Sequence, residues 1–308
     1  MKTKMLSFVV LLILAFFHTL IQADDHALTL SSYEPNTVTW VKDSNDVNYM
    51  DFKVSLKYPL TIHNEYCDAI KSESLSQLNL YFAFTTRFAQ YLKTRDSSPV
   101  VGKQFAPRIF NRFWLGDKEQ YLDLGYVHES NGQDVNDFSE YLALRQQYLV
   151  GNENPDFAND YISRGWDYVE MRVKHGKLYN EGKLSAYLML RHYLRDGFAQ
   201  GEPEEIRDWE RPGEIPLKRK DIDGLHVLTK YQLDQCHGGW LTLCDGKLAL
   251  SYTTGIARPF EHHSYRAELT FVVAGTLPLT FWYAYGHQSD LIDYDKRVES
   301  FGLGVEFI

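Results

Sequence analysis

Short segments of alternating apolar and polar side chains recur along this chain and constrain its fold more than any other feature. In residues 184–193 the apolar positions are Leu184, Ala186, Leu188 and Leu190, and near the C-terminus they are Phe301, Leu303, Val305 and Phe307. Successive side chains of a β-strand point to opposite faces, so each segment has one apolar face and one polar or small face. Soluble sandwiches and transmembrane barrels share this pattern, and it predicts an all-β protein.

The first residues have the features of a secretory signal peptide. Lys2 and Lys4 precede an apolar run over residues 6–17, and Ala23 supplies a small residue at the expected cleavage point. The run is shorter than the roughly 20 residues of a spanning helix, which favours cleavage over a single membrane anchor. We therefore expect a signal peptide at 1–23 and one β-barrel domain over 24–308.

Composition favours the barrel over the sandwich. The chain holds 21 Tyr, 18 Phe and 6 Trp, yet its mean hydropathy is −0.36. A membrane barrel combines an outward apolar band, aromatic girdles at both interfaces and a polar interior, which explains an aromatic-rich chain that is polar on average. The net charge of −9 argues against a nucleic-acid partner.

Two segments lack the alternating pattern. Residues 194–225 are charged and rich in Pro and Gly, and we expect one long exposed loop there. Residues 133–162 form a second insertion, with a short helix possible at 145–150. Cys236 and Cys244 could close a small disulfide loop, and Cys67 would then stay unpaired; the spacing leaves this open.

One cluster of residues could carry chemistry. His128 and Ser130 are two positions apart, so on a strand they share one face, where the imidazole could serve as base for the hydroxyl. Asp167, in the next strand-like segment, could orient the imidazole. Taken alone, the spacing also fits a chance pair on a strand and a solvated acid at a strand end.

Longer motifs make a specific resemblance. The segments Gly-Tyr-x-His-x-Ser-Asn-Gly at 125–132 and Ser-Arg-x-Trp-Asp at 163–167 resemble the bacterial outer-membrane phospholipase A family. Residues 285–294 resemble the family's segment before its last strand, and residues 97–99 and 106–110 form a weaker match. The resemblance implies a transmembrane antiparallel β-barrel of about 12 strands with the site on its lipid-facing wall.

The same resemblance implies the role of each site residue. Ser130 is the nucleophile, His128 the base and Asp167 the orienting group, where the family usually has Asn. The backbone N–H of Gly132 would contact the oxyanion. Calcium would be held by Ser163, by the carbonyl of Gln133, and by a carbonyl of Ser97 or Ser98 of the partner subunit.

One departure from the family concerns the calcium residues. The family joins its two motifs by a short turn, whereas residues 133–162 intervene here. Such an insertion is tolerated when its ends meet. Ser139 is an alternative calcium serine, but it lacks the Arg-x-Trp-Asp context, so Ser163 is preferred.

The expected function is calcium-dependent hydrolysis of phospholipid acyl esters (phospholipase A1/A2 and lysophospholipase type) in the outer membrane of a Gram-negative bacterium. The active form would be a homodimer. Tyr126 and Trp166 would flank the site near the lipid headgroups. Two alternatives stay open: a non-enzymatic barrel, either a pore or a structural protein, and an esterase of the lipid A deacylase kind.

Overall fold

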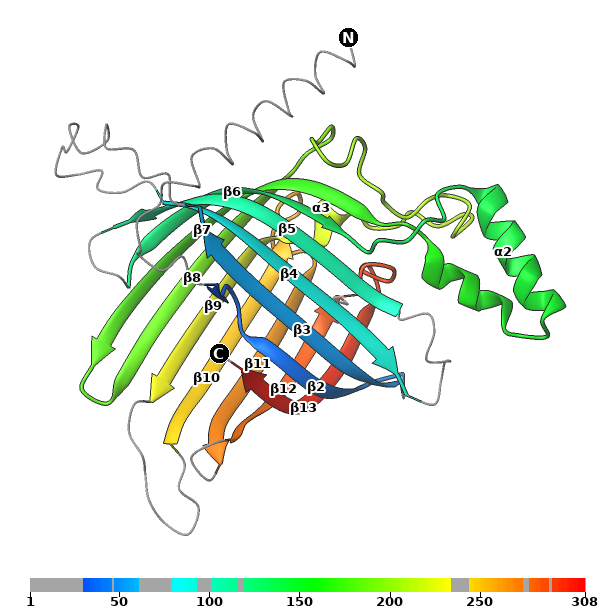
Figure 1. Cartoon of the computed structure of the whole chain (residues 1–308). Coiled ribbons are helices and arrows are strands. Elements are labelled where there is room, and N and C mark those ends of the chain that lie inside the picture. Colours follow the sequence, from blue (N-terminus) through cyan, green and yellow to red (C-terminus); the bar gives the residue numbers. More distant parts are fainter. Residues whose placement is uncertain are drawn as a thin grey trace.

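Twelve antiparallel strands close into a barrel in the computed structural model of the chain, which describes residues 30–45, 47–60, 79–92, 101–115, 119–233, 244–273, 277–287 and 290–307. Each strand pairs with its neighbours in sequence order, the last pairs with β2, and β3 pairs with β4, so the ring has no free edge (Figure 1). The expected all-β transmembrane barrel is confirmed. The strands are β2 (Asn36–Asp43), β3 (Asn48–Pro59), β4 (Asn79–Tyr91), β5 (Val101–Trp114), β6 (Tyr121–Ser130), β7 (Gly165–Tyr179), β8 (Gly182–Tyr193), β9 (Gly224–Leu233), β10 (Cys244–Gly255), β11 (His263–Val273), β12 (Leu277–His287) and β13 (Arg297–Phe307).

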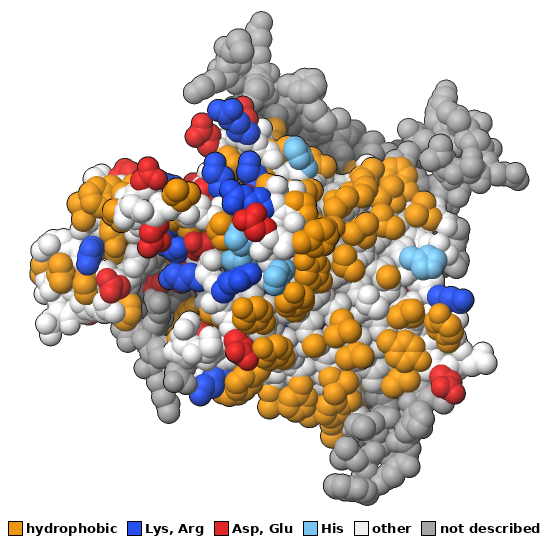
Figure 2. Space-filling model, turned by 180° about the vertical axis from the view of Figure 1, so that it is seen from behind, with side chains coloured by type: hydrophobic (Ala, Val, Ile, Leu, Met, Phe, Trp, Pro, Cys, Tyr) orange, Lys and Arg blue, Asp and Glu red, His pale blue; other side chains and the backbone are white. Residues whose placement is uncertain are grey.

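The outer wall of the barrel is apolar, as the alternation predicts. Leu188 and Leu303 are about 40% exposed, whereas Ser185 and Ser300, on the opposite face of the same strands, are buried. Figure 2 shows hydrophobic side chains spread over the wall, with charged side chains gathered between the wall and the projecting lobe. Among the described helices, none is both long and apolar enough to span a membrane.

The wall should tolerate no charge at mid-strand. Leu188 lies opposite Val173 and Val227 on the neighbouring strands, so an arginine there would lie between two valines and face lipid. We expect Leu188→Arg to lower the free energy of unfolding from lipid vesicles by about 2–4 kcal/mol. Denaturant titration followed by tryptophan fluorescence measures it, with Leu188→Ala as the apolar control; equal stability of the Arg and Ala variants would contradict the assigned face.

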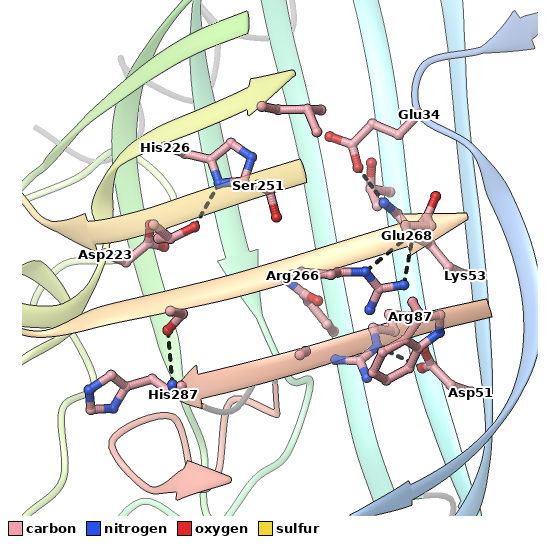
Figure 3. Close-up of a pocket in the computed structure, with 18 of the residues that line it drawn as sticks. Glu34, Asp51, Lys53, Arg87, Asp223, His226, Ser251, Arg266, Glu268 and His287 are labelled. Atoms are coloured by element: carbon pink, nitrogen blue, oxygen red, sulfur yellow. Dashed lines mark hydrogen bonds and ion pairs between the residues drawn. The ribbon is translucent and has the colours of Figure 1, made fainter. Parts of the chain in front are cut away.

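The interior is lined with charged side chains that form ion pairs, as buried charges require. Figure 3 shows some of them, including Lys53, Arg87 and Glu268, projecting from several strands into a cavity of about 560 Å³. The closest N–O distances of five pairs run from 2.6 to 3.1 Å, and the pairs are Lys53–Glu34, Arg87–Asp51, Arg108–Glu170, Arg112–Asp123 and Arg266–Glu268.

A segment before β2 turns into this interior. The short β1 (Ser31–Ser32) pairs with β3, and the chain then places Tyr33 and Glu34 inside the barrel. The Tyr33 ring centre is 4.8 Å from the guanidinium carbon of Arg108 and 4.6 Å from that of Arg172. The segment therefore fills part of the lumen.

The two insertions are more ordered than their composition predicts. Residues 133–162 contain α2 (Phe138–Val150), whose N-cap is Asp137, and the 3-10 helix η2 (Pro155–Tyr161). The helix expected at 145–150 is real but begins seven residues earlier, at the cap. The lobe made by α2 and η2 projects away from the barrel (Figure 1).

Between β8 and β9 the described chain forms only the short α3 (Arg219–Ile222), yet the expectation of an exposed loop over residues 194–225 is wrong for part of this segment. Ile206 is buried in a cluster with Trp166, Ile222, Leu291 and Tyr294. The predicted signal peptide, Ser97, Ser98, Cys67 and Cys236 lie outside the described residues, as does the side chain of Cys244.

Candidate active site

The candidate residues lie on the outer wall, where β6 pairs with β7. The register places His128 opposite Asp167 and Ser130 opposite Gly165. His128 and Ser130 alternate with Val127 and Glu129, whose side chains are buried. The pair therefore faces outward, on the same side of β6 as the exposed Leu124, and lies on the lipid-facing surface.

His128 and Asp167 are hydrogen-bonded, with 2.8 Å between Nδ1 of the ring and Oδ1 of the carboxylate. An ionised carboxylate can only accept, so the shared proton is on Nδ1, and in the neutral ring Nε2 then carries the lone pair. This tautomer is the one that a general base needs. The sequence prediction that Asp167 orients the imidazole agrees with this geometry.

The hydroxyl of Ser130 makes no hydrogen bond to the His128 ring within the described part of the chain. Such contacts commonly tighten only when a substrate is bound. Gly132 follows with φ of +61°, a conformation that favours glycine, and its Cβ position would be 3.0 Å from the Phe105 ring. Its N–H has no partner among the described residues, so it is free to contact an oxyanion next to Ser130.

Asn131 holds the two ends of the 133–162 insertion together. Its amide donates to the carbonyl of Ile162 at 2.8 Å, and its side-chain oxygen accepts from the N–H of Arg164 at 3.0 Å. Val135 continues the contact, because its carbonyl accepts from the N–H of Ser163 at 2.9 Å. The ends of β6 and β7 therefore lie as close together as they would if a short turn joined them.

Three donors that the sequence did not reveal hold the second oxygen of Asp167. The hydroxyl of Tyr126 donates to Oδ2, and so do the backbone N–H groups of Ala199 and Gln200, at 2.8 and 2.7 Å. Tyr126 is two residues before His128 on the same face, a spacing that could have indicated it. The backbone amides leave no signature in the sequence.

The predicted calcium residues are brought together in part. The Ser163 hydroxyl donates to the Glu204 carboxylate at 2.7 Å, and the contacts of Asn131 and Val135 hold Gln133 beside the same junction. Glu204 belongs to a charged segment whose sequence resembles a solvated loop, so sequence reasoning did not predict its contact with Ser163. Ser139 lies instead in the first turn of α2, where its hydroxyl donates to Asp137 at 2.5 Å.

Trp166 is not beside the lipid headgroups, and this expectation is wrong. It faces the interior and is fully buried, with its ring centre 5.3 Å from that of Tyr294. The Tyr294 hydroxyl lies 2.6 Å from the Glu205 carboxylate and 2.8 Å from the carbonyl of Leu217. Burial and then the Glu205 charge raise the pKa of Tyr294, so it stays a donor that anchors residues 205–217.

The fold is similar to solved structures of outer membrane phospholipase A. The Salmonella typhi phospholipase, a dimer with bound calcium, is 16% identical over 92% of this chain and 94% of that chain, with a TM-score of 0.57. The Escherichia coli protein is 16% identical over 95% and 97%, with a TM-score of 0.56; an active-site mutant of it is 15% identical over the same shares, with a TM-score of 0.57. The expected resemblance is confirmed at the level of the fold. No protein-family model matches the chain, and no curated protein matches it by sequence.

Proposed function

We propose that this protein is a calcium-dependent phospholipase of the outer membrane of a Gram-negative bacterium, active as a homodimer, that hydrolyses phospholipid acyl esters. The observation that carries the proposal is the His128–Asp167 hydrogen bond on the lipid-facing wall, two residues from an outward serine. A hydrolase of soluble substrates has no reason to turn its nucleophile toward lipid. The dimer with calcium described for the Salmonella typhi phospholipase supports the assembly state.

The reaction follows from these positions. The Ser130 oxygen attacks the ester carbonyl while Nε2 of His128 accepts its proton, and Asp167 stabilises the imidazolium. The oxyanion accepts a hydrogen bond from the N–H of Gly132. The lysophospholipid oxygen leaves with the proton from His128, and water then cleaves the acyl-serine ester by the same proton path in reverse.

The donor chemistry beside the site fits calcium. Ser163 and Glu204 supply hydroxyl and carboxylate oxygens, and Gln133 a carbonyl, all of them hard ligands of the kind that calcium takes. No group of three His, Cys, Asp or Glu that could hold a metal occurs in the described ranges. Bound calcium would supply positive charge beside the oxyanion.

Glu204 gives this assignment a test that does not depend on activity. Loss of its charge should weaken calcium binding about tenfold or more, because calcium sites are tuned by the number of charged ligands. We expect Glu204→Gln to show this in a calorimetric titration with calcium, and Glu202→Gln, an exposed position in the same loop, to leave the affinity unchanged. Equal affinities in both variants would remove Glu204 from the site.

The side chains inside the barrel argue against the alternative of a pore. Ion pairs cross between strands and the Tyr33 ring lies beside two arginines, so these side chains occupy part of the lumen. The lining of the interior cavity includes none of His128, Ser130 and Asp167. The two sides of the wall therefore have separate roles, with support inside and chemistry outside.

Release of fatty acid from detergent-dispersed phospholipid tests the proposal. The wild type should release fatty acid with calcium and lose at least about tenfold of its rate with a chelator, since positive charge at the oxyanion would be removed. Conductance in planar bilayers with no hydrolysis would favour the pore, and release from lipid A alone would favour the deacylase. Equal release with calcium and with chelator would remove calcium from the mechanism.

A further inference from the structure

The loop between β8 and β9, residues 194–223, runs across the outer face of Asp167. Leu194 donates its N–H to the carbonyl of Asp167 at 2.8 Å, and Glu204 donates its N–H to the carbonyl of Gly165 at 2.9 Å. Between these two contacts the chain leaves the strand and passes over the side chain of Asp167. As a result this carboxylate is only 2% exposed, although it belongs to the outward face of β7.

A buried carboxylate must be satisfied by hydrogen bonds, and Asp167 receives four. Oδ1 contacts His128, and Oδ2 accepts from Tyr126, Ala199 and Gln200. Each of the three groups around Oδ2 donates a hydrogen bond to it. An oxygen is therefore required at that position, and rotation of the carboxylate would break several bonds at once.

We propose that the hydroxyl of Tyr126 and the backbone amides of Ala199 and Gln200 are positioning groups, which fix Asp167 and through it the tautomer of His128. The loop is thus a working part of the site and not only a connection between strands. The expected effect of the loop on the rate of hydrolysis rests on the proposed function, whereas its effect on the geometry of Asp167 does not.

The loop is held from its far side as well. Glu210 pairs with the guanidinium of Arg164, which is almost fully buried, and the Glu205 carboxylate accepts from the N–H of Arg219 at 3.0 Å. Trp209 packs on Tyr141 of α2, with 5.2 Å between ring centres. These contacts bind the loop to the rim and the lobe, so the amides at 199 and 200 are presented by an anchored segment.

Two glycines in the loop provide a matched pair of variants. A Cβ on Gly197 would lie 2.1 Å from Oδ2 of Asp167 and 2.4 Å from its Cβ, and this side chain cannot yield while four hydrogen bonds hold it. A Cβ on Gly201 would meet nothing within 4 Å. Gly197→Ala should therefore lift the loop from Asp167, and Gly201→Ala should leave it in place.

Two measurements on the full chain report the result without relying on activity. We expect Gly197→Ala to lose at least tenfold of the hydrogen-exchange protection of the Ala199 and Gln200 amides, and nitrogen NMR of labelled histidine to show His128 as a mixture of tautomers. Wild type and Gly201→Ala should keep both amides protected and the proton on Nδ1. Protection and a single tautomer retained in Gly197→Ala would overturn the proposal.

Activity separates this inference from the proposed function. If the wild type is a phospholipase, Gly197→Ala should lower kcat about a hundredfold, since small misplacements of catalytic groups have effects of this size, and Gly201→Ala should not. An unchanged kcat with the loop displaced would overturn the positioning role. A wild type without hydrolase activity that still shows the expected exchange and tautomer would uphold the positioning and overturn the proposed function.

Discussion

Ser130→Ala is expected to abolish fatty-acid release, with a loss of at least about a thousandfold, because no acyl-enzyme can form without the hydroxyl. The effect should fall on kcat, since the methyl group leaves the lipid-facing surface intact. Fatty-acid release by purified protein in detergent, with calcium present, measures it. Ser130 faces outward at the end of β6, so the substitution removes no buried contact and the barrel should fold normally.

Ser139→Ala is the matched control for this experiment. Ser139 is the serine that the sequence offered as an alternative to Ser163 for calcium, and the structure places it in α2, bound to Asp137. Its loss should leave the rate within about twofold, with at most a small cost at the helix N-terminus. The reverse outcome, an inactive Ser139→Ala beside an active Ser130→Ala, would mean that the wrong serine was chosen.

Asp167→Asn has the second-largest expected effect, a loss of about ten-thousandfold in kcat. An amide has one oxygen and one NH2 group, and both oxygens of Asp167 accept hydrogen bonds. If the NH2 faces His128, the ring is forced into the tautomer that cannot act as base. If the NH2 faces Ala199 and Gln200, it meets their N–H groups and displaces the loop.

The contrast with the resembled family makes this substitution informative. In that family the residue corresponding to Asp167 is usually Asn, so a site that works with either side chain would accept Asn in this chain too. We expect intolerance, because the backbone N–H groups of Ala199 and Gln200 can only donate and both point at Oδ2. Steady-state rates of Asp167→Asn and Asp167→Ala should be similarly low, and full activity of the Asn variant would show that the loop does not select the carboxylate.

Sequence reasoning reached the barrel and the His128–Ser130 face because strand alternation is a local property. Residues two apart share a face whatever the rest of the chain does. The same logic failed for Trp166, because alternation identifies which residues share a face but not which face is inside. Asp167 lies on the outward face and Trp166 on the inward one.

The loop contacts could not be predicted from local pattern. Ala199 and Gln200 act through backbone N–H groups, which every residue but proline has. Glu204 and Glu205 resemble a solvated charged run until the fold brings Ser163 and Tyr294 to them. Contacts between residues far apart in sequence depend on the three-dimensional path of the loop.

The central claim is that Ser130 is a nucleophile activated by His128 on the outer wall. An alkylphosphonate p-nitrophenyl ester tests it directly, because an activated serine displaces p-nitrophenolate and becomes phosphonylated, and the modified peptide is identified by mass spectrometry. We expect one adduct, on the peptide that carries Ser130, in the wild type, and at least a hundredfold slower labelling in His128→Ala. Labelling at another residue, or equal labelling in the two proteins, would contradict the account.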